Sequence, residues 1–103
     1  MPENSRWTIR PAAETDLADI WTRGAATWGE SQAERYADGL FALFDLLAEF
    51  PEMAHERREF TPPVRIHPSG SHLVIYRPEE GRRVEIIRIL HAHQNQIVYL
   101  NDG

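Results

Sequence analysis

The order of hydrophobic patterns along the chain is the feature that most constrains its fold. Trp7-Thr8-Ile9-Arg10 alternates apolar and polar residues, which is typical of a short, half-buried strand. Residues 12–28 and 31–50 then repeat apolar side chains every three or four positions, as amphipathic helices do. From residue 64 onward the pattern returns to alternation. A strand, two helices and then several strands within 103 residues predict a single α+β domain.

The two helical segments are expected to form an antiparallel hairpin, because Gly29 leaves almost no chain between them. Ser31 and Glu34 have the spacing of a capping box, which predicts where the second helix begins. Pro51 should end it. Four aromatic residues in the helical stripes are interpreted as the contact of the hairpin with a sheet: Trp21, Trp28, Tyr36 and Phe44.

The last part of the chain predicts a small, mainly antiparallel sheet. A polar loop over residues 52–63 should precede it. The expected strands are residues 64–67, 72–76 and 83–91, with turns at 68–70 and 78–81. Consecutive Ile86 and Ile87 indicate an internal strand with both faces covered. Residues 97–100 form an apolar island that is either a final strand or a segment docked on the core.

Composition narrows the classes of function. The chain has no Cys, so disulfides and thiolate metal sites are not available to it. Its net charge of −5 argues against a protein that binds the phosphate backbone of nucleic acid or reads its sequence. Residues 1–54 carry most of the acids, whereas residues 55–93 are mildly basic, which suggests two surfaces for different partners. With no signal-peptide pattern or long apolar stretch, we expect a cytoplasmic protein that does not contact membranes.

Residues in all three blocks resemble the ParE branch of the RelE/ParE toxin superfamily. In the first helix they are Ala13, Asp16-Leu17 and Ile20. In the second they are Gly29, Ala33, Tyr36, Leu40, Phe44, Leu47-Ala48 and Pro51. In the strands they are Arg65, His72 to Tyr76 and Arg88-Ile89-Leu90-His91. The resemblance covers the chain up to about His93, and it implies the RelE/ParE-like fold: an N-terminal strand and a helical hairpin packed on a small sheet.

The resemblance implies the toxin of a type II toxin–antitoxin module. Such a toxin is held in a hetero-oligomer by a ParD-like antitoxin and inhibits DNA gyrase when free, by binding and not by a known catalytic site. We expect no cofactor and no metal. Two alternatives remain open: a RelE-like ribosome-dependent ribonuclease that cleaves messenger RNA, and a degenerate member that binds antitoxin without being toxic. The fold alone cannot choose between them.

Candidate site residues follow from these alternatives. A ribonuclease could use His91 to exchange protons, Arg65 and Arg88 to stabilise phosphorane charge, and Tyr76 to stack on a base. The competing interpretation is structural, with Arg88 paired to an acid and the others packed at strand ends. His91 and His93 could also form a metal pair, but no third ligand is evident, so a surface or packing role is preferred.

Antitoxin-binding candidates lie on the basic half of the chain and in its tail. They are Arg57, Arg58, Arg82, Arg83, Ile97, Tyr99 and Leu100. The arginines would receive acidic side chains of the antitoxin. Arg57 and Arg58 could equally form a self-compensating surface patch with Glu56 and Glu59. Residues 94–103 are expected to be a docking tail.

Overall fold

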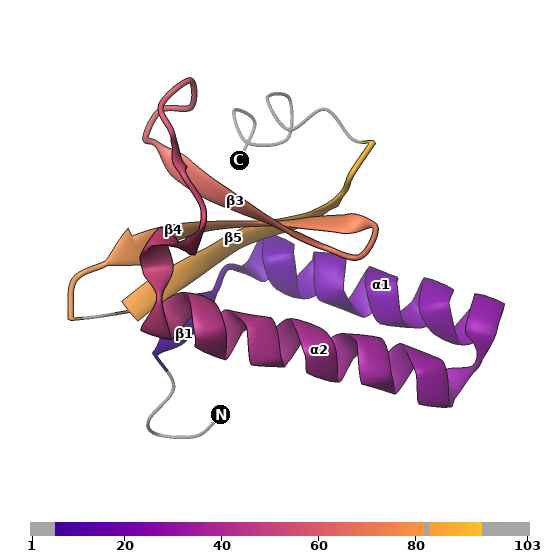
Figure 1. The fold of residues 1–103 in the computed structure, drawn as a ribbon. Coiled ribbons are helices and arrows are strands. Elements are labelled where there is room, and N and C mark those ends of the chain that lie inside the picture. Colours follow the sequence, from indigo (N-terminus) through magenta and orange to yellow (C-terminus); the bar gives the residue numbers. More distant parts are fainter. Residues whose placement is uncertain (1–5, 82, 94–103) are drawn as a thin grey trace.

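The fold is a two-layer α+β arrangement in which a helical hairpin packs on one sheet (Figure 1). The computed structural model describes residues 6–81 and 83–93. Its elements in chain order are β1 (Trp7–Ile9), α1 (Pro11–Trp28), α2 (Glu30–Glu49), the 3₁₀ turn η1 (Pro51–Met53), β2 (Glu56–Arg57), β3 (Val64–Ser69), β4 (His72–Glu79) and β5 (Arg83–His91). The predicted fold class is confirmed. No helix among the described residues is long and apolar enough to cross a membrane.

The sheet has five strands in the order β1-β5-β4-β3-β2. All neighbouring strands are antiparallel except β1, which runs parallel to β5. The strand β5 is therefore internal, as its apolar sequence predicts. The parallel pair needs a crossover connection, and the helical hairpin between β1 and the rest of the sheet provides it.

The helical hairpin is closed by a single residue, Gly29. Its φ of 94° is a left-handed value that glycine adopts without a steric penalty, and its N–H donates to the Ala25 carbonyl. The predicted capping box is wrong, because the second helix begins at Glu30 and shows no side-chain cap. The turn is so tight that Ser31 already lies inside the first turn of α2.

The main core lies between the hairpin and the sheet. Leu40, Phe44 and Leu47 of α2 are fully buried there, against Val74 and Ile86 of the central strands. Trp7 joins the short β1 to α2, and its ring stacks on that of Phe41 at 5.8 Å between centroids. Its indole N–H donates to the Asp45 carboxylate at 2.8 Å, and its ring packs edge-on against Phe44 at 5.1 Å between centroids. These contacts compensate for the small size of a three-residue strand.

A β-bulge between β4 and β5 decides which side chains of β5 face the hairpin. Tyr76 is paired with Ile86 but its neighbour Ile75 is paired with Arg88, so Ile87 is the additional residue. The phase of the strand shifts there by one position. As a result Ile86 and Ile89 both pack in the main core, although they are three residues apart.

The second face of the sheet is also covered. Phe60, Val64, Ile75, Ile87 and Leu90 form a second buried cluster, in which each side chain is at most 4% exposed. Phe60 comes from the segment predicted to be an irregular loop, which instead contains η1 and β2. The prediction that both faces of this strand are covered is confirmed, because Ile86 and Ile87 belong to different clusters.

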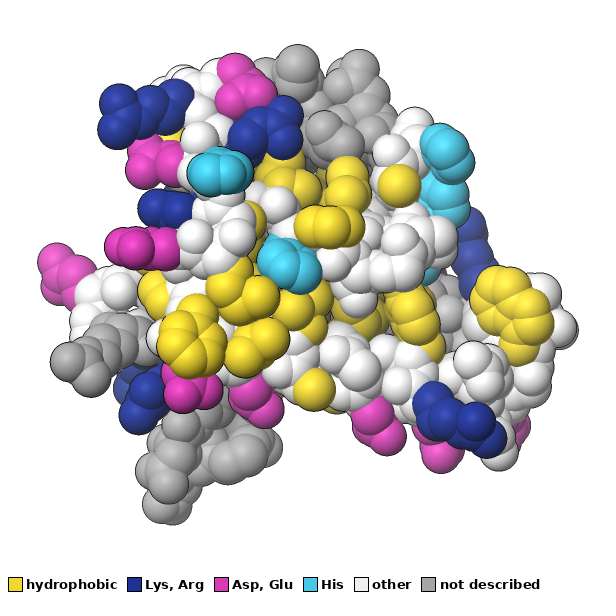
Figure 2. Space-filling view, viewed as in Figure 1, with side chains coloured by type: hydrophobic (Ala, Val, Ile, Leu, Met, Phe, Trp, Pro, Cys, Tyr) yellow, Lys and Arg dark blue, Asp and Glu magenta, His cyan; other side chains and the backbone are white. Residues whose placement is uncertain are grey.

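Large apolar side chains remain exposed at two places on the hairpin. Trp28, at the far end of α1, is 73% exposed, so its predicted contact with the sheet is wrong. The physical reason is visible in Figure 1: the hairpin extends well beyond the sheet at the end that carries the α1–α2 turn. Figure 2 shows a second group of apolar side chains over the other end of α2 and the adjoining η1.

Candidate functional site

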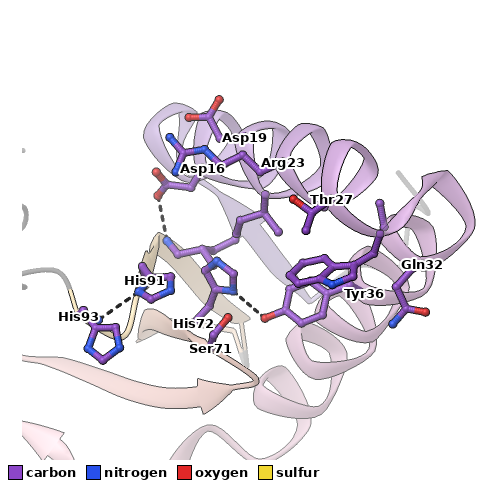
Figure 3. Close-up of a pocket in the computed structure, with 15 residues that line it drawn as sticks. Asp16, Asp19, Arg23, Thr27, Gln32, Tyr36, Ser71, His72, His91 and His93 are labelled. Carbon is purple, nitrogen blue, oxygen red and sulfur yellow. Dashed lines mark hydrogen bonds between the residues drawn. The ribbon is translucent and has the colours of Figure 1, made fainter.

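A groove of about 720 Å³ opens between the helical hairpin and the ends of β4 and β5 (Figure 3). Helix α1 contributes one wall, the first turns of α2 contribute another, and the ends of the strands contribute histidines. Its size is within the range of ligand-binding clefts in proteins. Apolar Ile20 and Ile89 line it together with charged and hydrogen-bonding side chains, so it suits a ligand of mixed character.

Asp16 joins α1 to β5 at one side of the groove. Its carboxylate receives two hydrogen bonds from the Arg88 guanidinium, at 2.8 Å from Nε and 2.9 Å from Nη2. It also accepts the backbone N–H of Ile89 at 2.9 Å. The side chains of Arg88 and Asp16 are only 19% and 14% exposed. A planar guanidinium facing a carboxylate in this way is a strong, directional pair, and it fixes α1 to the strand.

Tyr36 and His72 form a hydrogen-bonded pair at the opposite side of the groove. The Tyr36 hydroxyl donates to the Ser69 carbonyl at 2.7 Å and lies 2.7 Å from Nδ1 of His72. A phenol has one proton to donate. Since Ser69 receives that proton, Nδ1 of His72 must carry its own hydrogen and donate to the phenol oxygen. In the neutral ring Nε2 is then the nitrogen with a free lone pair.

Burial decides the ionisation of both members of this pair. It lowers the pKa of His72 from its ordinary value; the positive potential of His91 lowers it further, while Asp16 acts in the opposite direction. Burial also raises the pKa of Tyr36, against a smaller lowering by the hydrogen bond to Ser69. At neutral pH both groups are therefore uncharged, and the pair acts as a neutral hydrogen-bonding unit.

His91 and His93 continue the row of imidazoles toward the rim. The ring of His91 lies 5.6 Å from that of His72 and 5.1 Å from that of His93, between centroids. Nδ1 of His91 accepts the backbone N–H of His93 at 3.3 Å, so one ring nitrogen of this histidine pair is already engaged, in keeping with the preferred surface or packing role. Among residues 6–81 and 83–93, no three His, Cys, Asp or Glu side chains gather in a way that could hold a metal ion.

The rim of the groove carries the exposed side chains Arg23 and Trp28 of α1. Trp and Arg are the residue types that carry a large share of the binding energy at protein–protein contact sites. Asp16 is neutralised by Arg88, so Arg23 and Asp19 are the remaining Arg, Asp or Glu side chains that line the groove.

The residues considered for a ribonuclease are not gathered in one site. Only His91 lines the groove. Tyr76 is fully buried and its hydroxyl donates to the Pro51 carbonyl at 2.8 Å. Arg65 donates to the Ala54 carbonyl and also lies beside Glu56. Arg88 pairs with Asp16. The guanidinium and phenol groups of this set are therefore engaged in holding the fold.

The antitoxin-binding candidates of the basic half are distributed over the surface. Arg57 pairs with Glu59 at 2.8 Å, and Arg58 pairs with Glu56 at 3.2 Å. Arg83 is exposed at the start of β5. Four further candidates lie outside the residues that the structure describes: Arg82, Ile97, Tyr99 and Leu100. The same applies to the expected docking tail, residues 94–103.

Sequence reasoning missed the Tyr36–His72 pair and the position of Trp28 at the rim. Tyr36 and His72 are 36 residues apart, and no local spacing relates them. The partner of Arg88 was foreseen only as an unspecified acid, and Asp16 is 72 residues away. The one available signal was that Asp16, Tyr36, His72 and Arg88 all belong to the pattern on which the family resemblance rests.

Comparison with known proteins gives a consistent result. Residues 8–96 match the family model described as the ParE toxin of the type II toxin–antitoxin system parDE. The chain is 43% identical over 88 residues to Toxin ParE1 of Caulobacter vibrioides, covering 85% of this chain and 90% of that one. It is 33% identical over 92 residues to Toxin ParE1 of Mycobacterium tuberculosis, covering 89% and 94%. A chain from the chromosomal ParDE system of P. aeruginosa has the same fold, with a TM-score of 0.69 and 18% identity over 84% of this chain and 95% of that chain.

Proposed function

The chain belongs to the ParE family of toxins from type II toxin–antitoxin systems, and from this premise we propose that it acts in the cytoplasm by binding and inhibiting DNA gyrase. A ParD-like antitoxin neutralises it in a hetero-oligomer. In this proposal the toxin performs no chemistry of its own, and its effect on the cell depends on occupying a surface of the target.

The observation that carries the non-catalytic part of the proposal is the engagement of Arg65, Tyr76 and Arg88 within the fold. Cleavage of RNA needs groups that touch the scissile phosphate and its neighbours. Tyr76 is 0% exposed and cannot stack on a base, and each arginine already contacts a carboxylate or a carbonyl. A net charge of −5 adds general repulsion toward a polyanionic substrate.

We further propose that the antitoxin fills the groove beside Trp28. A neutralising segment with an apolar anchor would pack on Ile20, Ile89 and the exposed indole. An acidic side chain beside that anchor would meet Arg23, and Tyr36 and His72 would stay neutral beneath it. This location fits better than the Arg57–Arg58 segment, because those arginines are already paired with glutamates.

The first experiment follows DNA and protein synthesis after induced expression in a susceptible bacterium. Labelled thymidine and labelled leucine report the two processes in the same culture. Thymidine incorporation should fall first, and purified gyrase should lose supercoiling activity when the toxin is added. Leucine incorporation falling first would instead support the ribonuclease, and no arrest of growth would indicate a degenerate member.

The antitoxin site is tested by titrating the cognate antitoxin into purified toxin variants. Trp28→Gln and Arg23→Glu change exposed side chains at the rim, so the fold should be retained. Each should weaken antitoxin binding at least about tenfold, as central interface residues do. Arg58→Glu, in the surface loop, is the matched control and should leave the affinity within about twofold. If Arg58→Glu weakened antitoxin binding more than Trp28→Gln and Arg23→Glu do, the antitoxin would instead bind at the Arg57–Arg58 segment.

A further inference from the structure

The outer side of α2 carries an apolar face that the fold does not use. Leu46, Phe50 and Met53 are 41%, 54% and 43% exposed, and they follow partly buried Leu43 at intervals of three and four residues. The 3₁₀ turn η1 follows α2 directly, with the Met53 N–H bonded to the Phe50 carbonyl at 3.0 Å. Four large apolar side chains aligned at one surface usually mark a site of interaction.

Small residues extend this face toward the middle of α2. Gly39 and Ala42 are exposed on the same side of the helix as Leu43 and Leu46, and nothing lies within 4 Å of the place where a Cβ at Gly39 would be. A partner helix can therefore approach the backbone closely there while its larger side chains meet Leu46 and Phe50. We call the set Gly39, Ala42, Leu43, Leu46, Phe50 and Met53 the α2 face.

A row of carboxylates runs beside the α2 face. Figure 2 shows acidic side chains along the lower edge of the molecule, below the apolar group at the end of α2. On α2 the acids follow one another at intervals of four or seven residues: Glu30, Glu34, Asp38, Asp45 and Glu49. Arg35 is the only base on this helix. Two copies of the chain joined through this face would bring like charges together, so the charge distribution disfavours a dimer.

The α2 face is separate from the groove. The groove takes its α2 residues from the first turns of the helix, namely Gln32, Ala33 and Tyr36. Leu46 lies about 21 Å further along the helix axis than Gln32, at 1.5 Å per residue. No residue of the α2 face lines the groove. One partner can therefore occupy the groove without covering the α2 face.

We propose that the α2 face is the surface with which the toxin holds the enzyme that it poisons, and that it receives a basic amphipathic segment of that enzyme. This inference rests on the proposed function. An enzyme that handles DNA presents arginines and lysines that contact phosphates. The carboxylate row would attract the same cationic side chains, while Leu46 and Phe50 would receive the apolar residues between them. Charge complementarity thus favours the target over a second copy of the toxin.

The test separates binding to the target from binding to the antitoxin. One variant combines Leu46→Gln with Phe50→Gln, and another combines Asp38→Arg with Glu49→Arg; all four side chains are exposed. Each variant is compared with wild type for growth arrest, for inhibition of purified gyrase and for antitoxin affinity. We expect at least about a tenfold loss of inhibition, with antitoxin affinity within about twofold of wild type. Arg58→Glu, in the surface loop, is the matched control, and it should keep both its inhibition of gyrase and its antitoxin affinity.

Three other outcomes would overturn the inference. Inhibition within twofold of wild type in both variants would show that the face does not bind the target. A parallel loss of antitoxin affinity would assign the face to the antitoxin. A wild-type dimer that Leu46→Gln and Phe50→Gln convert to monomer would assign it to self-association. If the wild-type chain arrests growth without inhibiting gyrase, the proposed target fails, and the growth readout of the variants still decides the role of the face.

Discussion

Replacing Asp16 with alanine is the sharpest test of how the hairpin is held to the sheet. The carboxylate of Asp16 accepts two hydrogen bonds from Arg88 and one from the Ile89 backbone N–H. Asp16→Ala removes all three at once. The Arg88 guanidinium, whose side chain is 19% exposed in the wild-type structure, then loses this carboxylate. The Ile89 backbone N–H loses its acceptor.

The expected loss of stability is about 3 kcal/mol. Removing one partner of a buried ion pair costs about 3–5 kcal/mol, and an unsatisfied backbone N–H costs about 1–3 kcal/mol. The two terms are not additive, and the remaining exposure of both side chains lets water recover part of the loss. A domain of this size is stabilised by about 5–15 kcal/mol in total, so the melting temperature should fall by about 10–20 °C.

Urea unfolding followed by tryptophan fluorescence measures the change. Asp16→Asn keeps an oxygen for Ile89 but loses the charge, so it should cost about half as much. Arg58→Ala, in a pair whose arginine is 82% exposed, should change stability by less than about 0.5 kcal/mol. The reasoning is refuted if Asp16→Ala costs no more than Arg58→Ala.

Two further predictions concern the turn and the histidine beside the groove. Gly70 has a φ of 58°, and a Cβ there would lie 3.0 Å from the Tyr36 hydroxyl, whereas Gly81 has a φ of 75° and open space around it. Gly70→Ala should therefore destabilise the protein by about 1–2 kcal/mol, and by more than Gly81→Ala in the same unfolding assay; equal costs would contradict the contact with Tyr36. The folded-state pKa of His72 is lowered from 6.5, mainly by burial and then by His91. As the pH falls below 6.5, the unfolded chain therefore binds more protons at this residue than the folded protein does. The stability that His72 contributes is thus present above its ordinary pKa and lost below it. Wild type should therefore lose more stability between pH 7.5 and pH 5.5 than His72→Gln does. Parallel pH profiles of the two proteins would argue against a buried neutral imidazole.

Periodicity located the helices and strands because each has one face that must be buried. The predicted first helix, residues 12–28, differs from α1 by one residue, and the predicted strand 83–91 coincides with β5. Contacts between distant parts of the chain were not predictable in this way. The position of Trp28 depends on how far the hairpin extends past the sheet, and the Tyr36–His72 pair depends on where the β3–β4 turn meets α2.

The bulge at Ile87 illustrates a second limit of sequence reasoning. Ile86 and Ile87 correctly indicated that both faces of β5 are covered. Their pattern did not indicate that Ile87 is an additional residue relative to β4, after which the alternation along β5 is shifted by one position. A bulge depends on the register with the neighbouring strand, which the sequence of one strand does not contain. That shift places Ile89 and His91 on the hairpin side of the sheet, where both line the groove.

The hydrogen bond between Asp16 and the Ile89 N–H also bears on aggregation. Beyond the three residues paired with β1, the outer edge of β5 has no neighbouring strand among the described residues. An open edge of this kind can add a strand from another molecule and start an intermolecular sheet. Asp16 occupies the donor that such a strand would need, and Pro68 removes a backbone donor from β3 near the opposite edge. A variant that lacks this carboxylate would therefore present a sheet edge to its neighbours, and its loss of soluble protein would exceed what reduced stability alone explains.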